Sequence, residues 1–175
     1  MKLLWLSAFL AVAVLSASAR VDAKPSFVSQ YTNLTSCKEV ASGDLDKGQD
    51  WVYVRCKGLG NIPVWYTCQD SARCKYGFGS KPNVSGPFGI GREGIIEWRG
   101  VLRRGRLEPI AVVIRLPSAD PEATSRNSLI VYRLRANGTS CIVGETSSNS
   151  DARRIADGSA DRFQCVGEPD DPPSD

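Results

Sequence analysis

The sequence predicts an α+β fold: antiparallel, meandering β-sheet structure of about six to eight strands, with one C-terminal helix and disulfide staples. Runs rich in β-branched and aromatic residues recur between turn signals made of Gly, Pro and Asn. Only residues 150–163 place apolar side chains at helical spacing. Six cysteines occur in a chain of 175 residues, which is long enough for one domain with a hydrophobic core.

The N-terminus has the pattern of a secretory signal peptide. Lys2 precedes the apolar run 3–15, which is too short to span a membrane, and the small residues 17–19 follow. We expect residues 1–23 to be removed, by cleavage after residue 19 or 23. The mature protein would then be periplasmic or secreted, with no membrane span. Residues 24–167 are interpreted as one globular domain, and residues 168–175 as a disordered acidic tail.

Strand-type runs alternate with turns through the middle of the chain. Residues 24–50 and the glycine-rich stretch 79–94 are expected to be loops, the first held by Cys37. Asn137-Gly138 predicts a hairpin with a type I′ turn, because both residues tolerate a positive φ. The expected strands are 51–56, 62–69, 72–78, 95–102, 109–116, 128–135 and 139–143. In the run 128–135, the alternation of side chains indicates one largely buried face.

The predicted helix lies near the C-terminus. Residues 149–151, Asn-Ser-Asp, offer an N-cap and early negative charge. One apolar stripe follows and is expected to pack on the sheet; it consists of Ala152, Ile155, Ala156, Ala160 and Phe163.

An even number of cysteines in an exported chain predicts disulfides. Cys68 and Cys74 flank a polar turn symmetrically, so they can face each other across a hairpin. Cys141 and Cys165 bracket the helix, which leaves Cys37 for Cys56. The expected pairs are therefore Cys37–Cys56, Cys68–Cys74 and Cys141–Cys165. The alternative, a thiolate metal site, lacks histidine partners and any close C-x-x-C pair, so neither a metal nor a cofactor is expected.

The absence of histidine excludes a Ser-His-Asp triad, a Cys-His dyad and a histidine metal site. A formal net charge of +3 is too small to indicate a nucleic-acid partner. Glu93 and Glu97 form the one tempting carboxylate pair, so a carboxylate-dependent hydrolase of the cell envelope stays as the alternative function. If Glu97 lies on a strand, we expect it to face solvent or to pair with an arginine.

The favoured function is a small binding or inhibitor module without catalytic activity. Its partner would be an envelope or extracellular protein, or an anionic ligand. The glycine-rich stretch could present an aromatic anchor, and the turn after residue 102 gathers arginines. The competing interpretation is a solvated loop and a solubilising surface that protects strand edges. The candidate binding residues are Phe88, Arg92, Arg103, Arg104 and Arg106.

A set of short motifs is spread over most of the mature chain: Gly58-Leu59-Gly60, Ile62-Pro63-Val64, Tyr76-Gly77, Glu97-Trp98-Arg99, the run 109–115, Leu129-Ile130-Val131, Cys141-Ile142-Val143-Gly144 and the closing segment 154–165. In these motifs the chain resembles a family of uncharacterised exported proteins of alphaproteobacteria. The resemblance implies export, with no activity to carry over. The cysteine pair at 68 and 74 departs from the family pattern.

Overall fold

The computed structural model describes residues 26–34, 36–69, 73–90, 94–117, 127–159 and 165, and only the backbone of residues 87–90. The expected signal peptide and acidic tail lie outside these residues. The described elements in chain order are β1 (Phe27–Asn33), β2 (Cys37–Ser42), the 3₁₀ helix η1 (Leu45–Lys47), β3 (Trp51–Lys57), β4 (Pro63–Gln69), β5 (Arg73–Phe78), β6 (Ser85–Ile90), β7 (Ile95–Arg103), β8 (Arg106–Pro117), β9 (Asn127–Leu134), β10 (Ser140–Thr146) and α1 (Asn149–Gly158).

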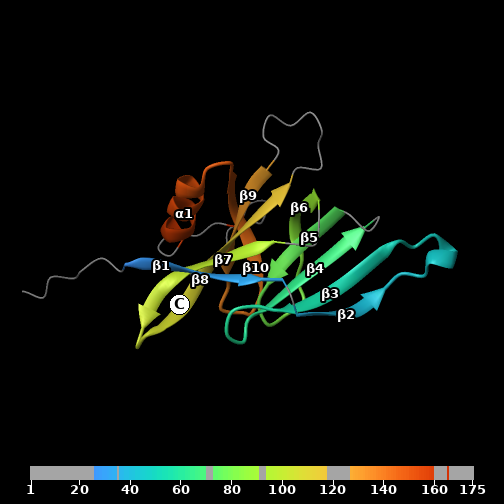
Figure 1. Cartoon of the computed structure of the whole chain (residues 1–175), viewed down its shortest axis with the longest axis horizontal. Helices are drawn as coiled ribbons and strands as arrows, with labels where there is room; N and C mark the ends of the chain where they lie inside the picture. Colours follow the sequence, from blue (N-terminus) through green and yellow to red (C-terminus); the bar gives the residue numbers. More distant parts are fainter. Residues whose placement is uncertain are drawn as a thin grey trace, which may run out of the picture.

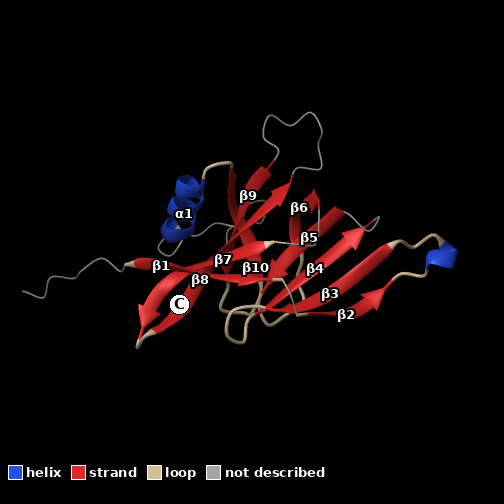
Figure 2. Ribbon diagram, in the orientation of Figure 1, coloured by secondary structure: helices blue, strands red, loops and turns tan. Residues whose placement is uncertain are grey.

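The strands form two antiparallel sheets of five strands each (Figure 1). Sheet A has the order β1-β7-β8-β9-β10, and sheet B has the order β2-β3-β4-β5-β6. Figure 2 shows that strands make up most of the regular structure and that α1 lies beside the strands of sheet A. The predicted class, antiparallel β-structure with one C-terminal helix and disulfide staples, is confirmed.

The structure has more strands than the sequence predicts. Residues 24–50, expected to be a loop, contain β1 and β2, and the expected loop 79–94 contains β6. All three missed strands lie at a sheet edge, with a neighbouring strand on one side only. An edge strand needs less apolar surface than a central strand, so its sequence carries a weak hydrophobic pattern. Every residue of β2, for example, is exposed.

The main core lies between the inner faces of the two sheets. Phe78 of sheet B sits edge-on to two rings of sheet A, with ring-centroid distances of 4.9 Å to Tyr132 and 6.0 Å to Trp98. All three side chains are fully buried. Such edge-to-face pairs add to the stabilisation that burial of the rings provides. Burial also raises the pKa of the nearby Tyr76 to about 12, so this core phenol stays neutral.

The helix α1 covers the outer face of sheet A. Ala152 and Ala156 of the helix pack against small and β-branched residues of β8 and β9, in a cluster that includes Ala111, Val113 and Val131. The middle of β9 is therefore buried on both faces, so the buried face predicted for 128–135 is confirmed and the opposite face is buried there as well. The helix begins after the N-cap Ser148, whose side chain accepts a hydrogen bond from the Asp151 amide. The predicted helix residues 160–163 lie outside the described residues.

Two tight turns correct the predicted turn chemistry. At Asn137-Gly138 only the glycine has a positive φ, of 82°, so the expected type I′ turn is wrong. The Asn137 side chain instead accepts a hydrogen bond from the Thr139 amide, at 3.0 Å. Positive φ at two successive residues occurs at Arg104-Gly105, with values of 50° and 76°, and these residues close the β7–β8 hairpin. This is the pair of angles that a type I′ turn requires.

The three disulfides are the three predicted pairs. Cys37–Cys56 and Cys68–Cys74 each join directly facing residues of neighbouring strands. Cys141–Cys165, with a Cα–Cα distance of 5.6 Å, ties the chain beyond α1 back to β10. Three such bonds are typical of a protein that folds in an oxidising compartment.

Replacing Cys141 and Cys165 by serine together should lower the free energy of unfolding by about 3 kcal/mol, because the unfolded chain is no longer closed into a loop. The two cysteines are 24 residues apart in sequence. Urea unfolding followed by tryptophan fluorescence measures the change. A loss below about 1 kcal/mol would show that the C-terminal segment contributes little to the folded state.

Candidate functional site

The structure places three of the five predicted binding residues at one hairpin. Arg103, Arg104 and Arg106 surround the tip of the β7–β8 hairpin, which lies far from β6 in Figure 1. Phe88 belongs to β6, but its side chain is not described, and Arg92 lies outside the described residues. At the hairpin, Arg103 Nε is 3.1 Å from Glu108 Oε2, and both side chains are largely exposed. The hairpin arginines therefore lie apart from the strand that carries Phe88.

Glu97 lies on the outer face of sheet A and is buried, with 9% of its surface exposed. Its Oε1 accepts hydrogen bonds from Arg153 Nε of α1 at 2.7 Å and from Ser29 Oγ of β1 at 2.5 Å. The expectation that Glu97 pairs with an arginine is confirmed. The carboxylate is thus engaged in joining the helix to two strands. Its candidate partner Glu93 lies outside the described residues.

A second buried charge completes this docking network between α1 and sheet A. Arg99 donates two hydrogen bonds to the Asp157 carboxylate, at 2.9 and 2.7 Å, and a third to Ser29 Oγ at 2.9 Å. A forked arginine–carboxylate pair fixes direction as well as distance. The sequence offers one signal for this network: in Glu97-Trp98-Arg99, the charged residues flank an inward-pointing tryptophan on a strand.

The outer face of sheet B is covered by no helix in the described structure, and it is basic. Strand residues that alternate with core residues point to this face. On β3, Val54 and Cys56 belong to the core, so Arg55 and Lys57 point outward. Lys38 of β2 lies directly opposite Arg55 in the register. On β5, Arg73 and Lys75 flank the core residue Cys74 and lie on the same outer face.

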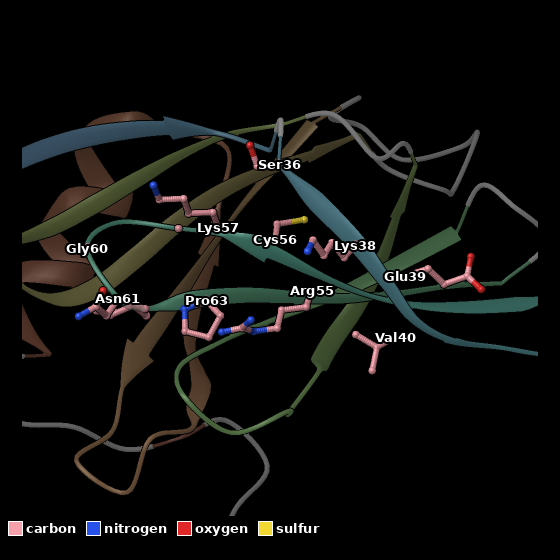
Figure 3. A pocket seen from close by; sticks show the side chains of 12 residues that line it. Ser36, Lys38, Glu39, Val40, Arg55, Cys56, Lys57, Gly60, Asn61 and Pro63 are labelled. Carbon is pink, nitrogen blue, oxygen red and sulfur yellow. The ribbon is translucent and has the colours of Figure 1, made fainter.

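An open pocket of about 700 Å³ lies where β2, β3 and the β3–β4 turn meet (Figure 3). Three exposed cations line it: Lys38, Arg55 and Lys57. Glu39 is the one acidic residue among the lining residues, and Figure 3 shows its carboxylate pointing away from the Arg55 guanidinium. The remaining lining residues are Ser36, Val40, Cys56, Gly58, Gly60, Asn61, Ile62 and Pro63.

Aromatic side chains hold the central cation of the pocket in place. The Arg55 guanidinium carbon lies 5.5 Å from the centre of the Trp65 ring, within the range of a cation–π contact. Tyr53 stacks on Trp65, with 5.8 Å between ring centroids and 15° between ring planes. The Trp65 indole is fixed in turn, because its Nε1 donates a 2.9 Å hydrogen bond to the Gly79 carbonyl. Arg55 is thus pre-organised before any ligand arrives.

The chemistry of this pocket is that of anion binding. Within the described residues, Lys38, Arg55 and Lys57 have no carboxylate within ion-pair distance. Ammonium and guanidinium groups donate hydrogen bonds and accept none, so a ligand that satisfies them must supply oxygen acceptors. Sequence reasoning missed the pocket because Lys38 belongs to a segment expected to be a loop. The predicted Cys37–Cys56 pair was the available signal, since it sets Lys38 beside Arg55.

A smaller hollow of about 370 Å³ lies on the outer face of sheet A beside the start of α1. Its lining includes Tyr31, Ile95, Glu97 and Arg115. The Arg115 guanidinium donates a 3.0 Å hydrogen bond to the Asn149 side chain, and Glu97 serves the docking network. The charged groups of this hollow are therefore already engaged with the helix.

Comparisons with models of protein families, with curated proteins and with solved structures gave no match. Across the described ranges, no helix has both the length and the apolar character needed to cross a membrane. The same residues contain no group of three His, Cys, Asp or Glu side chains that could hold a metal ion.

Replacing Asp157 by asparagine should lower the free energy of unfolding by about 2 kcal/mol, because it leaves the Arg99 charge without its carboxylate. Arg99 is only 8% exposed. The matched control is Asp151→Asn on the same helix, whose ion pair with Arg154 is largely exposed and should be worth less than about 1 kcal/mol. Equal losses in urea unfolding of the two variants would contradict a role for Arg99–Asp157 in docking the helix.

Proposed function

We propose that this chain is a non-catalytic binding module, exported to the periplasm or the cell exterior, that holds an anionic ligand in the pocket of Lys38, Arg55 and Lys57. The observation that carries the proposal is three exposed cations around one hollow, with no carboxylate of the described residues paired to any of them. The signal-peptide pattern and the three disulfides support export.

The charge distribution favours attraction of an anion to this face. Five basic residues occupy outward strand positions of sheet B, whereas Glu39 of β2 is the one acidic residue in its described strands. A surface of one sign raises the local concentration of an oppositely charged ligand and speeds its association. Because these side chains are exposed, salt will screen the attraction, and affinity should fall as ionic strength rises.

Arg55 gives the pocket geometric selectivity. Its guanidinium is planar and matches the two oxygens of a carboxylate or a phosphoryl group. Since Trp65 already orients this group, less side-chain entropy is lost when the ligand binds. Two lysines flank Arg55: Lys38 lies on β2, and Lys57 lies two residues beyond Arg55 on β3. They add positive charge without a fixed direction.

The arginines of the β7–β8 hairpin are a weaker candidate. Arg103 is engaged by Glu108, and none of Arg103, Arg104 and Arg106 lines either described hollow. Their exposure at a hairpin tip fits a solubilising role. The hydrolase alternative loses support as well, because Glu97 is bonded to Arg153 and Ser29.

The test compares two variants that each remove three positive charges, one at the pocket and one at the hairpin. The pocket variant is Lys38→Gln, Arg55→Gln, Lys57→Gln, and the hairpin variant is Arg103→Gln, Arg104→Gln, Arg106→Gln. The probe is inorganic tripolyphosphate, which is too small to bridge the two surfaces, and calorimetry at low ionic strength measures its affinity. We expect the pocket variant to lose about tenfold in affinity and the hairpin variant to stay within about threefold of the wild type.

Equal losses of affinity in the two variants would indicate attraction by net charge alone and would contradict the proposed pocket. Unchanged binding by the pocket variant would do the same. Circular dichroism of each variant checks that the fold is intact.

A further inference from the structure

We propose that the anionic ligand is an acidic oligosaccharide that lies along β3, with its acidic groups at the pocket and its sugar rings against Tyr53 and Trp51. The inference rests on the proposed function and deepens it by naming the class of ligand. It is carried by an aromatic strip that continues directly from the three cations.

The strip consists of the outward residues of one strand. Trp51, Tyr53, Arg55 and Lys57 alternate with Val52, Val54 and Cys56, which contact or belong to the core. The two cations that β3 contributes to the pocket are therefore followed, on the same face of the same strand, by two aromatic rings. At about 3.3 Å per residue the strip is roughly 20 Å long, which suits a chain of several units better than a single small ion.

The neighbouring segment of the chain places only small side chains beside these rings. Ala41 of β2 faces Tyr53 across the sheet and has only a methyl side chain. Trp51 lies beside Gly43, where an added Cβ would come within 2.7 Å of the indole Nε1. The indole therefore occupies space that only a glycine leaves open, and it remains 39% exposed. Ala41 of β2 and Gly43, which directly follows β2, thus leave room for the two large rings of β3.

The two rings differ in how they are held. Tyr53 is stacked on the buried Trp65, so its ring has a fixed orientation next to Arg55. Trp51 lies at the start of β3, toward η1, at the end of the strip away from the pocket. A ligand that uses both the rings and the cations must therefore carry flat apolar surfaces and negative charge along the same chain.

Acidic sugars have this combination. A pyranose ring presents apolar C–H faces that pack on aromatic rings, and its carboxylate or sulfate groups accept hydrogen bonds from guanidinium and ammonium. An oligophosphate offers charge without apolar faces, and an acidic peptide offers carboxylates without rigid rings. Single-stranded nucleic acid also combines stacking with charge. A net charge of only +3 argues against it, because such partners need many phosphate contacts.

The experiment measures the affinities of the oxidised protein for a hexamer of galacturonate and for tripolyphosphate, by calorimetry in one buffer. Tyr53→Leu and Trp51→Leu are the test variants, and both keep the net charge. We expect each variant to lower the affinity for the galacturonate hexamer about tenfold, and Trp51→Leu, at the end of the strip away from the pocket, to leave the affinity for tripolyphosphate within about twofold. The pocket variant should have a lower affinity for both probes, and the neutral sugar maltohexaose should not bind.

Controls separate the acidic sugar from its competitors. Hexaglutamate and a short single-stranded oligonucleotide should bind at least tenfold more weakly than the galacturonate hexamer. If either binds as tightly as the sugar, or if the two aromatic variants bind the sugar like the wild type, the inference is wrong while the anion pocket stands. If tripolyphosphate binding does not depend on the pocket cations, the proposed function itself fails. Trp51→Leu serves alone if Tyr53→Leu does not fold, because Trp51 is the more exposed ring.

Discussion

The rest of the structure depends on one constraint: the centre of sheet A, in β8 and β9, is apolar on both faces and must be covered twice. Residues 111–114 of β8 and 129–132 of β9 are buried without alternation. Sheet B covers the inner face and α1 covers the outer face. A run buried on both sides cannot face water. The C-terminal helix is therefore part of the fold, and the Arg99–Asp157 and Arg153–Glu97 pairs set where it docks.

Sheet B has no second cover within the described structure, and the proposed function follows from that difference. Its inward residues complete the core, while its outward residues are free to carry charge and aromatic rings. Stability and binding are thus assigned to alternate residues of the same strand. The Cys37–Cys56 disulfide serves both stability and binding, because it holds the exposed edge strand β2 in the register that sets Lys38 opposite Arg55.

Much of the fold could be predicted from the sequence, and the failures have physical causes. Apolar runs such as Ala111–Ile114 predict the central strands, and the alanine stripe predicts the helix. Edge strands lack such a pattern, because β2 buries no side chain and is defined by its pairing with β3. The candidate site was missed for the same reason: its cations meet through strand pairing, whereas the arginines around residue 104 are neighbours in sequence and attract attention. No local pattern reveals that Trp65 supports Arg55.

The most direct test of the central claim is to locate the bound anion by nuclear magnetic resonance. Tripolyphosphate would be titrated into isotope-labelled oxidised protein while the backbone amides, the Arg55 Nε–H and the tryptophan indole signals are followed. The account predicts that the largest shifts cluster at Lys38, Arg55 and Lys57, and at the Trp65 indole that supports Arg55. Largest shifts at residues 103–106, or small shifts spread evenly over all basic residues, would contradict it.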